Sequence, residues 1–227
     1  PAEKGDTAAR YAVNGLTKFV DMQGREAERQ KAVRAFLRAL DKAENAGVKA
    51  FFIRQIQFIG QAEAVRPLSK YLKDERLCEP VAQAFSAIKK PEASAALLFA
   101  LPTVRDNLKP TIIKALGDLQ SRAATLAILP FAESGDLNTR LMAYHAVANI
   151  GDPAGEEALK RALIQTSGYE RSQALSAYLR FAERLAEAEA EEKALDVYRT
   201  VLNTYTTNED VHIRSAALTG LVSIQGE

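Results

Sequence analysis

The chain has 227 residues, of which 47% are hydrophobic, and 30 Lys and Arg against 29 Asp and Glu give a formal net charge of +1. This composition can bury a core, whereas the balanced charge disfavours nucleic acid as a partner, because a phosphate-binding surface needs an excess of cations. No apolar run predicts membrane insertion, so we expect a soluble protein, cytoplasmic or exported.

Apolar spacing and turn residues predict about thirteen helices along the chain. Short connections make the members of each helix pair antiparallel, and we call the first member outer and the second inner. The prediction is an opening helix at 6–21, then 27–43 with 47–59, 61–73 with 77–88, 91–102 with 106–119, 121–133 with 136–150, 153–166 with 169–186, and 189–205 with 209–225.

The end of the inner helix recurs as an aliphatic residue followed by turn residues. It falls at Ile59, Ile88, Leu119 and Ile150, which are 29, 31 and 31 residues apart. A period of this length is typical of stacked helical repeats, in which each repeat contacts its neighbours. The sequence therefore predicts an all-α fold with one repeat domain over 1–227.

A polar residue stands near the start of each inner helix, and a cation often follows four positions later. A carboxylate there can cap the positive end of the helix, and the cation can bridge to a carboxylate of the neighbouring repeat. We expect a structural ladder formed by Asp6 and Arg10, Asp136 and Arg140, Asp210 and Arg214, and the lone cations Lys49 and Lys109.

Three segments carry a family resemblance: Asp210-Val211-His212-Ile213-Arg214, Asp136-Leu137-Asn138-Thr139-Arg140 and Leu116-Gly117-Asp118. They resemble the HEAT-repeat family, including the HEAT-like repeats of bacterial phycobilisome lyases. The resemblance covers nearly the whole chain and implies a right-handed α-α superhelix, a HEAT-like solenoid, but no particular activity.

The last part of the chain departs from this pattern. The repeat spacing lengthens to about 36 and 38 residues, and Ser172 and Ser176 replace the charged pair. The repeat over 169–225 is therefore atypical, and it also resembles a tetratricopeptide helix pair.

A helical wheel on 136–150 separates a buried arc, which includes Leu137, Leu141 and Tyr144, from an opposing strip. We expect this strip and its equivalents on other inner helices to line a concave groove: Asn138, Met142, His145, Asn149, Lys114, Asp118, Phe51, Arg54 and Phe58. The polar members suit hydrogen bonds to a peptide or sugar, and two Phe around an Arg suit a protein anchor. The plainer interpretation of the Phe residues is core packing.

Catalytic and metal-binding signals do not emerge from the sequence. The two histidines, His145 and His212, lie on separate repeats, and no HExxH or CxxC spacing is present. No nucleophile motif or phosphate-cradling glycine motif occurs either. We therefore expect no cofactor and no enzymatic activity from these residues.

The leading interpretation is a non-enzymatic scaffold that binds a protein, or another domain of its parent chain, along the groove. The alternative is a structural spacer in a multidomain bacterial enzyme, because similar HEAT-like segments accompany 3-keto-disaccharide hydrolase-like domains. The chain starts at Pro1 without Met, as if its N-terminus were processed or truncated, and it ends where the repeat would begin a further helix. We therefore expect a segment of a larger bacterial protein. A HEAT-like DNA glycosylase or a bilin lyase ranks last, and the sequence does not indicate an oligomeric state.

Overall fold

The computed structural model describes residues 6–207 and 210–226, and within these ranges the chain forms helices and no β-strand. This confirms the all-α fold. The α-helices are α1 (Asp6–Val20), α2 (Glu26–Lys42), α3 (Ala46–Ile59), α4 (Ala62–Ser69), α5 (Cys78–Ile88), α6 (Pro91–Ala100), α7 (Lys109–Asp118), α8 (Thr125–Ile128), α9 (Leu137–Ile150), α10 (Glu156–Gln165), α11 (Gly168–Glu187), α12 (Glu191–Thr204) and α13 (Val211–Gln225). The predicted start of the last helix, at 209, lies outside the described residues.

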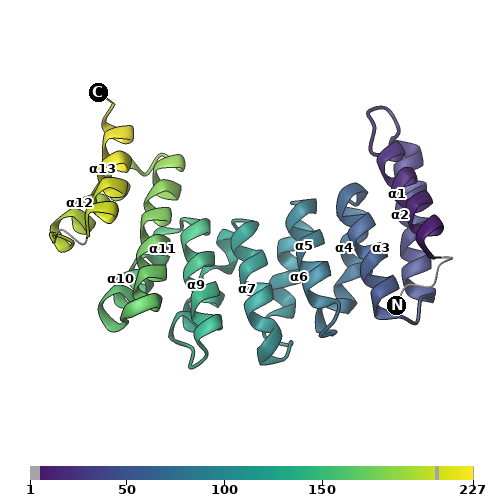
Figure 1. Ribbon diagram of the computed structural model, residues 1–227, viewed down its shortest axis with the longest axis horizontal. Helices are drawn as coiled ribbons and strands as arrows, with labels where there is room; N and C mark the ends of the chain where they lie inside the picture. Colours follow the sequence, from purple (N-terminus) through teal and green to yellow (C-terminus); the bar gives the residue numbers. More distant parts are fainter. Residues whose placement is uncertain (1–5, 208–209, 227) are drawn as a thin grey trace. The chain divides into compact units, whose positions relative to one another are not determined.

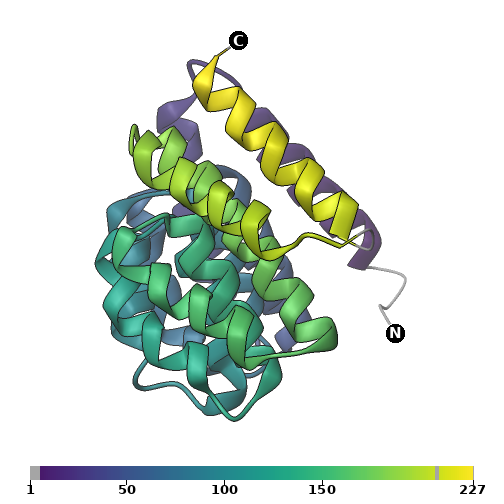
Figure 2. The same cartoon turned by 90° about the vertical axis from the view of Figure 1, so that its left-hand side faces the viewer.

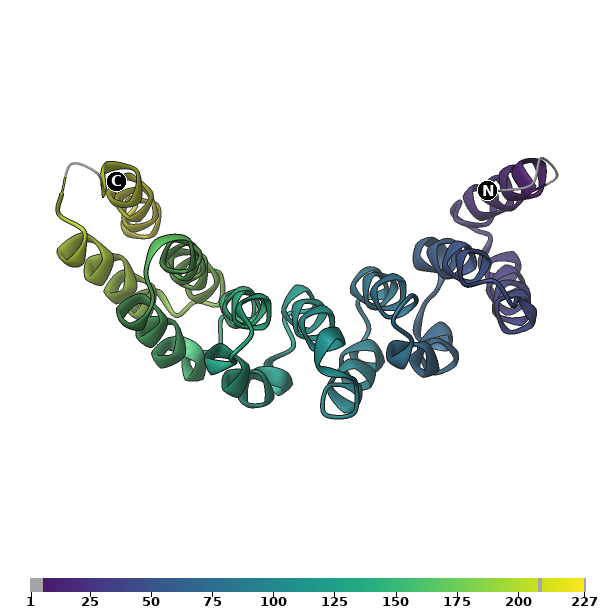
Figure 3. The ribbon, with the colours of Figure 1, turned by 60° about the horizontal axis from the view of Figure 1, so that its bottom comes forward.

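The chain divides into two compact units, one that ends at Ala115 and one that begins at Leu116. In the first unit, α3 packs against α2 and α5, and α4 packs against α6 (Figure 1). In the second unit, α11 packs against α9, α10 and α12, and α13 lies beside α12 (Figure 2). Viewed nearly along the helix axes, each unit shows its outer and inner helices in two layers (Figure 3).

Proline marks the places where two outer helices lose regular α-helical structure. Pro67 lies inside α4, which passes directly into the 3-10 helix Lys70–Lys73. Pro130 lies in the 3-10 helix Leu129–Glu133, which follows the single-turn α8. A proline ring removes a donor and clashes with the preceding turn, so the α-helical hydrogen-bond pattern is not continued.

Side-chain caps define where two inner helices begin. The Oδ1 atom of Asn45 accepts hydrogen bonds from the backbone N of Gly47 at 2.7 Å and of Val48 at 3.3 Å. The Oδ2 atom of Asp136 accepts one from the backbone N of Thr139 at 2.8 Å. These bonds satisfy N–H groups that have no partner within the helix.

A buried guanidinium joins the first two repeats of the first unit. Arg29 of α2 is 6% exposed, and its NH1 atom donates to the carbonyl oxygen of Ile59, at the end of α3, at 2.5 Å. The same side chain pairs with Glu26 and with Glu63 of α4, each at 2.7 Å. Both carboxylates raise the pKa of Arg29, Glu26 most strongly. The charge is therefore compensated where it is buried.

Inner helices approach closely at a glycine in the second unit. A Cβ atom on Gly117 of α7 would lie 2.5 Å from the Cα atom of Ala146 on α9. Such a distance leaves no room for any side chain. Gly117 therefore allows the end of α7 to lie this close to Ala146.

Candidate functional site

The last residue of α7 and the inner helices α9 and α11, all within the second unit, carry a chain of hydrogen-bonded polar side chains. The Nε2 atom of His145 on α9 lies 3.0 Å from Oδ1 of Asp118 on α7 and 2.8 Å from Nδ2 of Asn149. The Oδ1 atom of Asn149 accepts a hydrogen bond at 3.4 Å from Arg180 of α11, which also pairs with Glu183 at 2.7 Å. We call these five residues the inner row.

One nitrogen of His145 faces two neighbours with opposite requirements. Asp118 needs a donor when it is ionised, whereas the amide nitrogen of Asn149 needs an acceptor. The Nε2 atom satisfies Asp118 when it carries a proton and Asn149 when it does not. The side chains are accessible for further bonds, since His145 is 41% and Asp118 is 29% exposed.

The inner row contains three of the side chains that the sequence places in the groove, together with two that it missed. Asp118, Asn149 and Arg180 are spaced by 31 residues each, which is the repeat period itself. Applying that period once more beyond Asn149 would have found Arg180. On α9, the predicted groove residues Asn138 and Met142 are exposed and half-buried, respectively.

The remaining predicted groove residues lie in the first unit. Phe58 is 66% exposed, and Arg54 and Lys114 are exposed as well. Phe51 is half-buried, because its ring lies 4.7 Å from the guanidinium of Arg10 and packs edge-on against a neighbouring Phe. Of the predicted aromatic anchor, Phe58 with Arg54 thus remains at the surface, whereas Phe51 contributes to packing.

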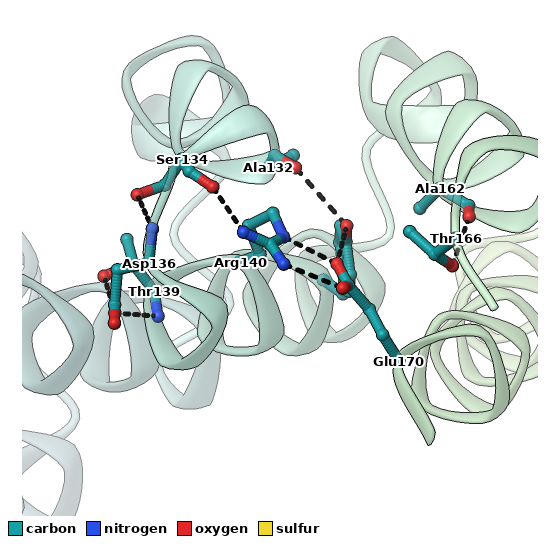
Figure 4. A network of polar contacts seen from close by, with 9 residues as sticks. Ala132, Ser134, Asp136, Thr139, Arg140, Ala162, Thr166 and Glu170 are labelled. Carbon is teal, nitrogen blue, oxygen red and sulfur yellow. Dashed lines mark hydrogen bonds and ion pairs between the residues drawn. The ribbon is translucent and has the colours of Figure 1, made fainter. Parts of the chain in front are cut away.

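Of the predicted ladder residues, Arg140 bridges to the next repeat. Its Nε and NH2 atoms donate to the two carboxylate oxygens of Glu170 on α11 at 2.6 and 2.7 Å, and its NH1 atom donates to the carbonyl of Ser134 (Figure 4). The hydroxyl of Tyr144 lies 3.0 Å from Glu170. Asp136 caps α9 and does not take part in the bridge.

Other ladder residues have local or different partners. Arg10 pairs with Asp6 within α1 at 2.7 Å, and Lys109 pairs with Asp106 at 2.6 Å. Lys49 lies 5.3 Å from the ring of Tyr71 in the next outer helix. At the start of α13, Asp210 accepts from Thr207 at 2.7 Å instead of capping the helix, and Arg214 is half-buried.

A cleft of about 630 Å³ surrounds the bridge between Arg140 and Glu170. Its second arginine, Arg161, pairs with Glu133 at 2.7 Å, so both cations face a carboxylate. Arg140, the main cause, lowers the pKa of Glu170, while burial and then Glu170 raise the pKa of Tyr144 to about 12. Neither group changes its protonation near neutral pH, which suits a structural role better than proton transfer.

No cluster of three His, Cys, Asp or Glu within 6–207 and 210–226 could hold a metal ion. Burial is the main cause that raises the pKa of the Cys78 thiol to about 12, so it stays protonated and unreactive. His212 lies exposed on α13. Over the same ranges, none of the helices combines the length and apolar character needed to cross a bilayer.

No protein-family model matches the sequence, and no curated protein sequence does either. Among solved structures, the complex of CpcE and CpcF of phycocyanin lyase from Nostoc sp. PCC7120 is similar with a TM-score of 0.52 and 20% identity, over 98% of this chain and 91% of that chain. An engineered protein matches with a TM-score of 0.49 and 19% identity, over 94% and 96% of the two chains. A designed armadillo repeat protein in complex with the peptide (KR)4 matches with a TM-score of 0.48 and 17% identity, over 91% and 99%. At 20% identity, the likeness to the CpcE and CpcF complex concerns the fold alone. The chain folds as a HEAT-like helical-repeat solenoid.

Proposed function

We propose that this chain is a non-enzymatic scaffold that binds an extended segment of a partner protein, or of another domain of its parent chain, across the inner row. The observation that supports this proposal is the row itself. Asp118, Asn149 and Arg180 recur at the repeat period on successive inner helices, and each is at least partly exposed. A regular array of this kind suits a ligand that is itself extended.

The chemistry of the row matches that of a polypeptide backbone. Asn149 offers both a donor and an acceptor, which is what a peptide group requires. Asp118 and Arg180 place opposite charges on either side of Asn149. The opposite charges favour one direction of a charged partner over the other.

The row is also held in place before any partner binds. Each of its side chains already has a hydrogen bond to a neighbour, so little rotational freedom remains to be lost. Ordering a long side chain at an interface costs about 0.5–1.5 kcal/mol, and preorganisation reduces that cost. Affinity then depends on the partner's own bonds to the row.

The test is affinity capture from a lysate of the source organism, quantified by mass spectrometry, with the wild type beside the double variant Asn149→Ala, Arg180→Glu. A matched control is Arg122→Glu, a charge reversal at an exposed residue of the 3-10 helix Arg122–Ala124 in the same unit. Circular dichroism should show that all three proteins are folded.

We expect one protein or parent domain to be captured by the wild type and the control and lost by the double variant. Calorimetry with that purified partner should then show an affinity at least about tenfold weaker for the double variant, which corresponds to about 1.4 kcal/mol. Equal capture and equal affinity in a folded double variant would reject the inner row as the binding site.

A further inference from the structure

A second pocket lies between α10, α11 and α12, and it shares no residue with the inner row. Its volume is about 420 Å³, within the range of small-molecule sites. Its buried wall consists of Tyr178, Val201 and Tyr205, which are 0%, 1% and 7% exposed. Leu163 and Ile164 of α10 add further apolar surface, and Ile164 is 83% exposed. The pocket is therefore apolar inside and open to solvent at Ile164.

One buried polar atom in this wall has no hydrogen-bond partner. The hydroxyl oxygen of Tyr205 is buried and unpaired among the described residues, although its ring lines the pocket. A buried tyrosine hydroxyl normally finds a partner, and leaving it without one costs free energy. This oxygen is covered by its surroundings, so an occupant would supply the missing bond only by displacing them and bringing a polar atom to it.

Two cations, Arg171 and Lys160, line the pocket. Burial, and then the carboxylates of Glu156, Glu157 and Asp196, raise the pKa of the wall residue Tyr178. The exposed guanidinium of Arg171 lies 5.5 Å from the centre of the Tyr205 ring. The other cation, Lys160, is already paired with Glu156 at 2.7 Å. No acidic side chain is among the described residues that line the pocket, although the charge of Arg171 also acts on Asp210 nearby. Arg171 is thus the cation that an incoming anion would meet.

We propose that this pocket binds an amphipathic carboxylate, with the apolar chain against Tyr178, Val201 and Tyr205 and the carboxylate paired with Arg171. Burial of the chain supplies the affinity, and the guanidinium selects a negative head group. Occupation of this site is a function distinct from protein binding at the inner row, because it uses other residues of α11 and adds α10 and α12.

The test is a methyl NMR titration of the whole chain with decanoate below its micelle-forming concentration. We expect saturable shifts of the Leu163, Ile164 and Val201 methyl groups. Decyltrimethylammonium has the same chain with the opposite charge, and its affinity should be at least about tenfold weaker. No saturable shift with decanoate, or equal affinity for both probes, would overturn the proposal.

Three variants locate the contacts. Arg171→Gln should raise the decanoate Kd about tenfold, whereas Arg199→Gln, at an exposed arginine of α12 that does not line the pocket, should change it less than about twofold. An equal loss in both variants would show that Arg171 is not the anchor. Tyr205→Phe should raise the Kd about three- to tenfold, and an unchanged Kd would remove the hydroxyl from the site.

Discussion

Arg140 and Glu170 form a two-point ion pair between successive inner helices, with N–O distances of 2.6 and 2.7 Å and side chains that are only 22% and 16% exposed. The sequence predicts a cation at Arg140 that reaches a neighbouring repeat, but it does not tell whether water screens the pair. In the structure the pair is largely shielded, so each partner depends on the other to compensate its charge.

Replacing Glu170 by Gln should lower the free energy of unfolding by about 1–3 kcal/mol, because a partly buried guanidinium loses its anionic partner. Urea denaturation followed by circular dichroism measures the change. The matched control is Arg161→Gln, which breaks a pair whose members are 55% and 62% exposed. That variant should cost less than about 0.5 kcal/mol, and equal costs would contradict the shielding of the inner pair.

The same pair makes stability depend on pH on the acidic side. Arg140 lowers the pKa of Glu170 below its ordinary value of 4.5 in the folded protein. The resulting stabilisation is present above the pKa of the unfolded chain and is lost as the pH falls through the folded pKa. The difference in unfolding free energy between wild type and Glu170→Gln should therefore be full at about pH 7 and smaller at about pH 3.5. If this difference in unfolding free energy instead grew as the pH falls, the expected direction of the pKa shift of Glu170 would be wrong.

Two helical glycines should respond oppositely to the same substitution. Gly117→Ala should destabilise the chain by about 1–3 kcal/mol, because its new methyl group would meet the backbone of Ala146. Gly15→Ala in α1 should stabilise it by about 0.5–1 kcal/mol, since no atom lies within 4 Å of the new carbon and alanine favours the helix. Urea denaturation of both variants measures their free energies of unfolding. If both substitutions changed this free energy in the same direction, the close approach at Gly117 would be contradicted.

A buried hydrogen bond holds α1 against α3. The Thr17 hydroxyl lies 2.8 Å from Oε1 of Gln55 and 3.0 Å from the carbonyl oxygen of Val13, and Thr17 and Gln55 are 4% and 5% exposed. Thr17→Val keeps the side-chain shape but leaves the Gln55 oxygen without this donor, which should cost about 1–3 kcal/mol. Amide hydrogen exchange within α1 should accelerate. The control is Thr7→Val, at an exposed position of α1, which should leave exchange nearly unchanged. Equal acceleration of exchange in both variants would show that the bond between Thr17 and Gln55 does not hold α1 in place.

The sequence predicts long inner helices well, because cap, apolar period and terminal turn agree there. The predicted spans 47–59, 136–150 and 169–186 correspond to Ala46–Ile59, Leu137–Ile150 and Gly168–Glu187. The predicted outer helix 121–133 instead splits into two 3-10 segments around the single turn of α8. Helix propensity does not report how tightly each turn is wound when a proline and the neighbouring layer impose other hydrogen bonds.

The candidate site, too, was predictable from the sequence only in part. A helical wheel identifies the face that carries His145 and Asn149, because that face follows from the period alone. It places Leu137 on the buried arc, yet Leu137 is 41% exposed, since a wheel does not include where neighbouring helices end. Partners such as Glu170 depend on the distance and tilt between repeats, which no single helix encodes.

Arg29 determines how the first unit could be shortened. A cut before Glu26 would remove α1 and leave the buried guanidinium with Glu26, Glu63 and the carbonyl of Ile59. A cut after α2 would remove that guanidinium and orphan the last carbonyl of α3 together with the Glu63 carboxylate. The repeats near this end are therefore not interchangeable, because Arg29 of α2 compensates polar groups on both α3 and α4.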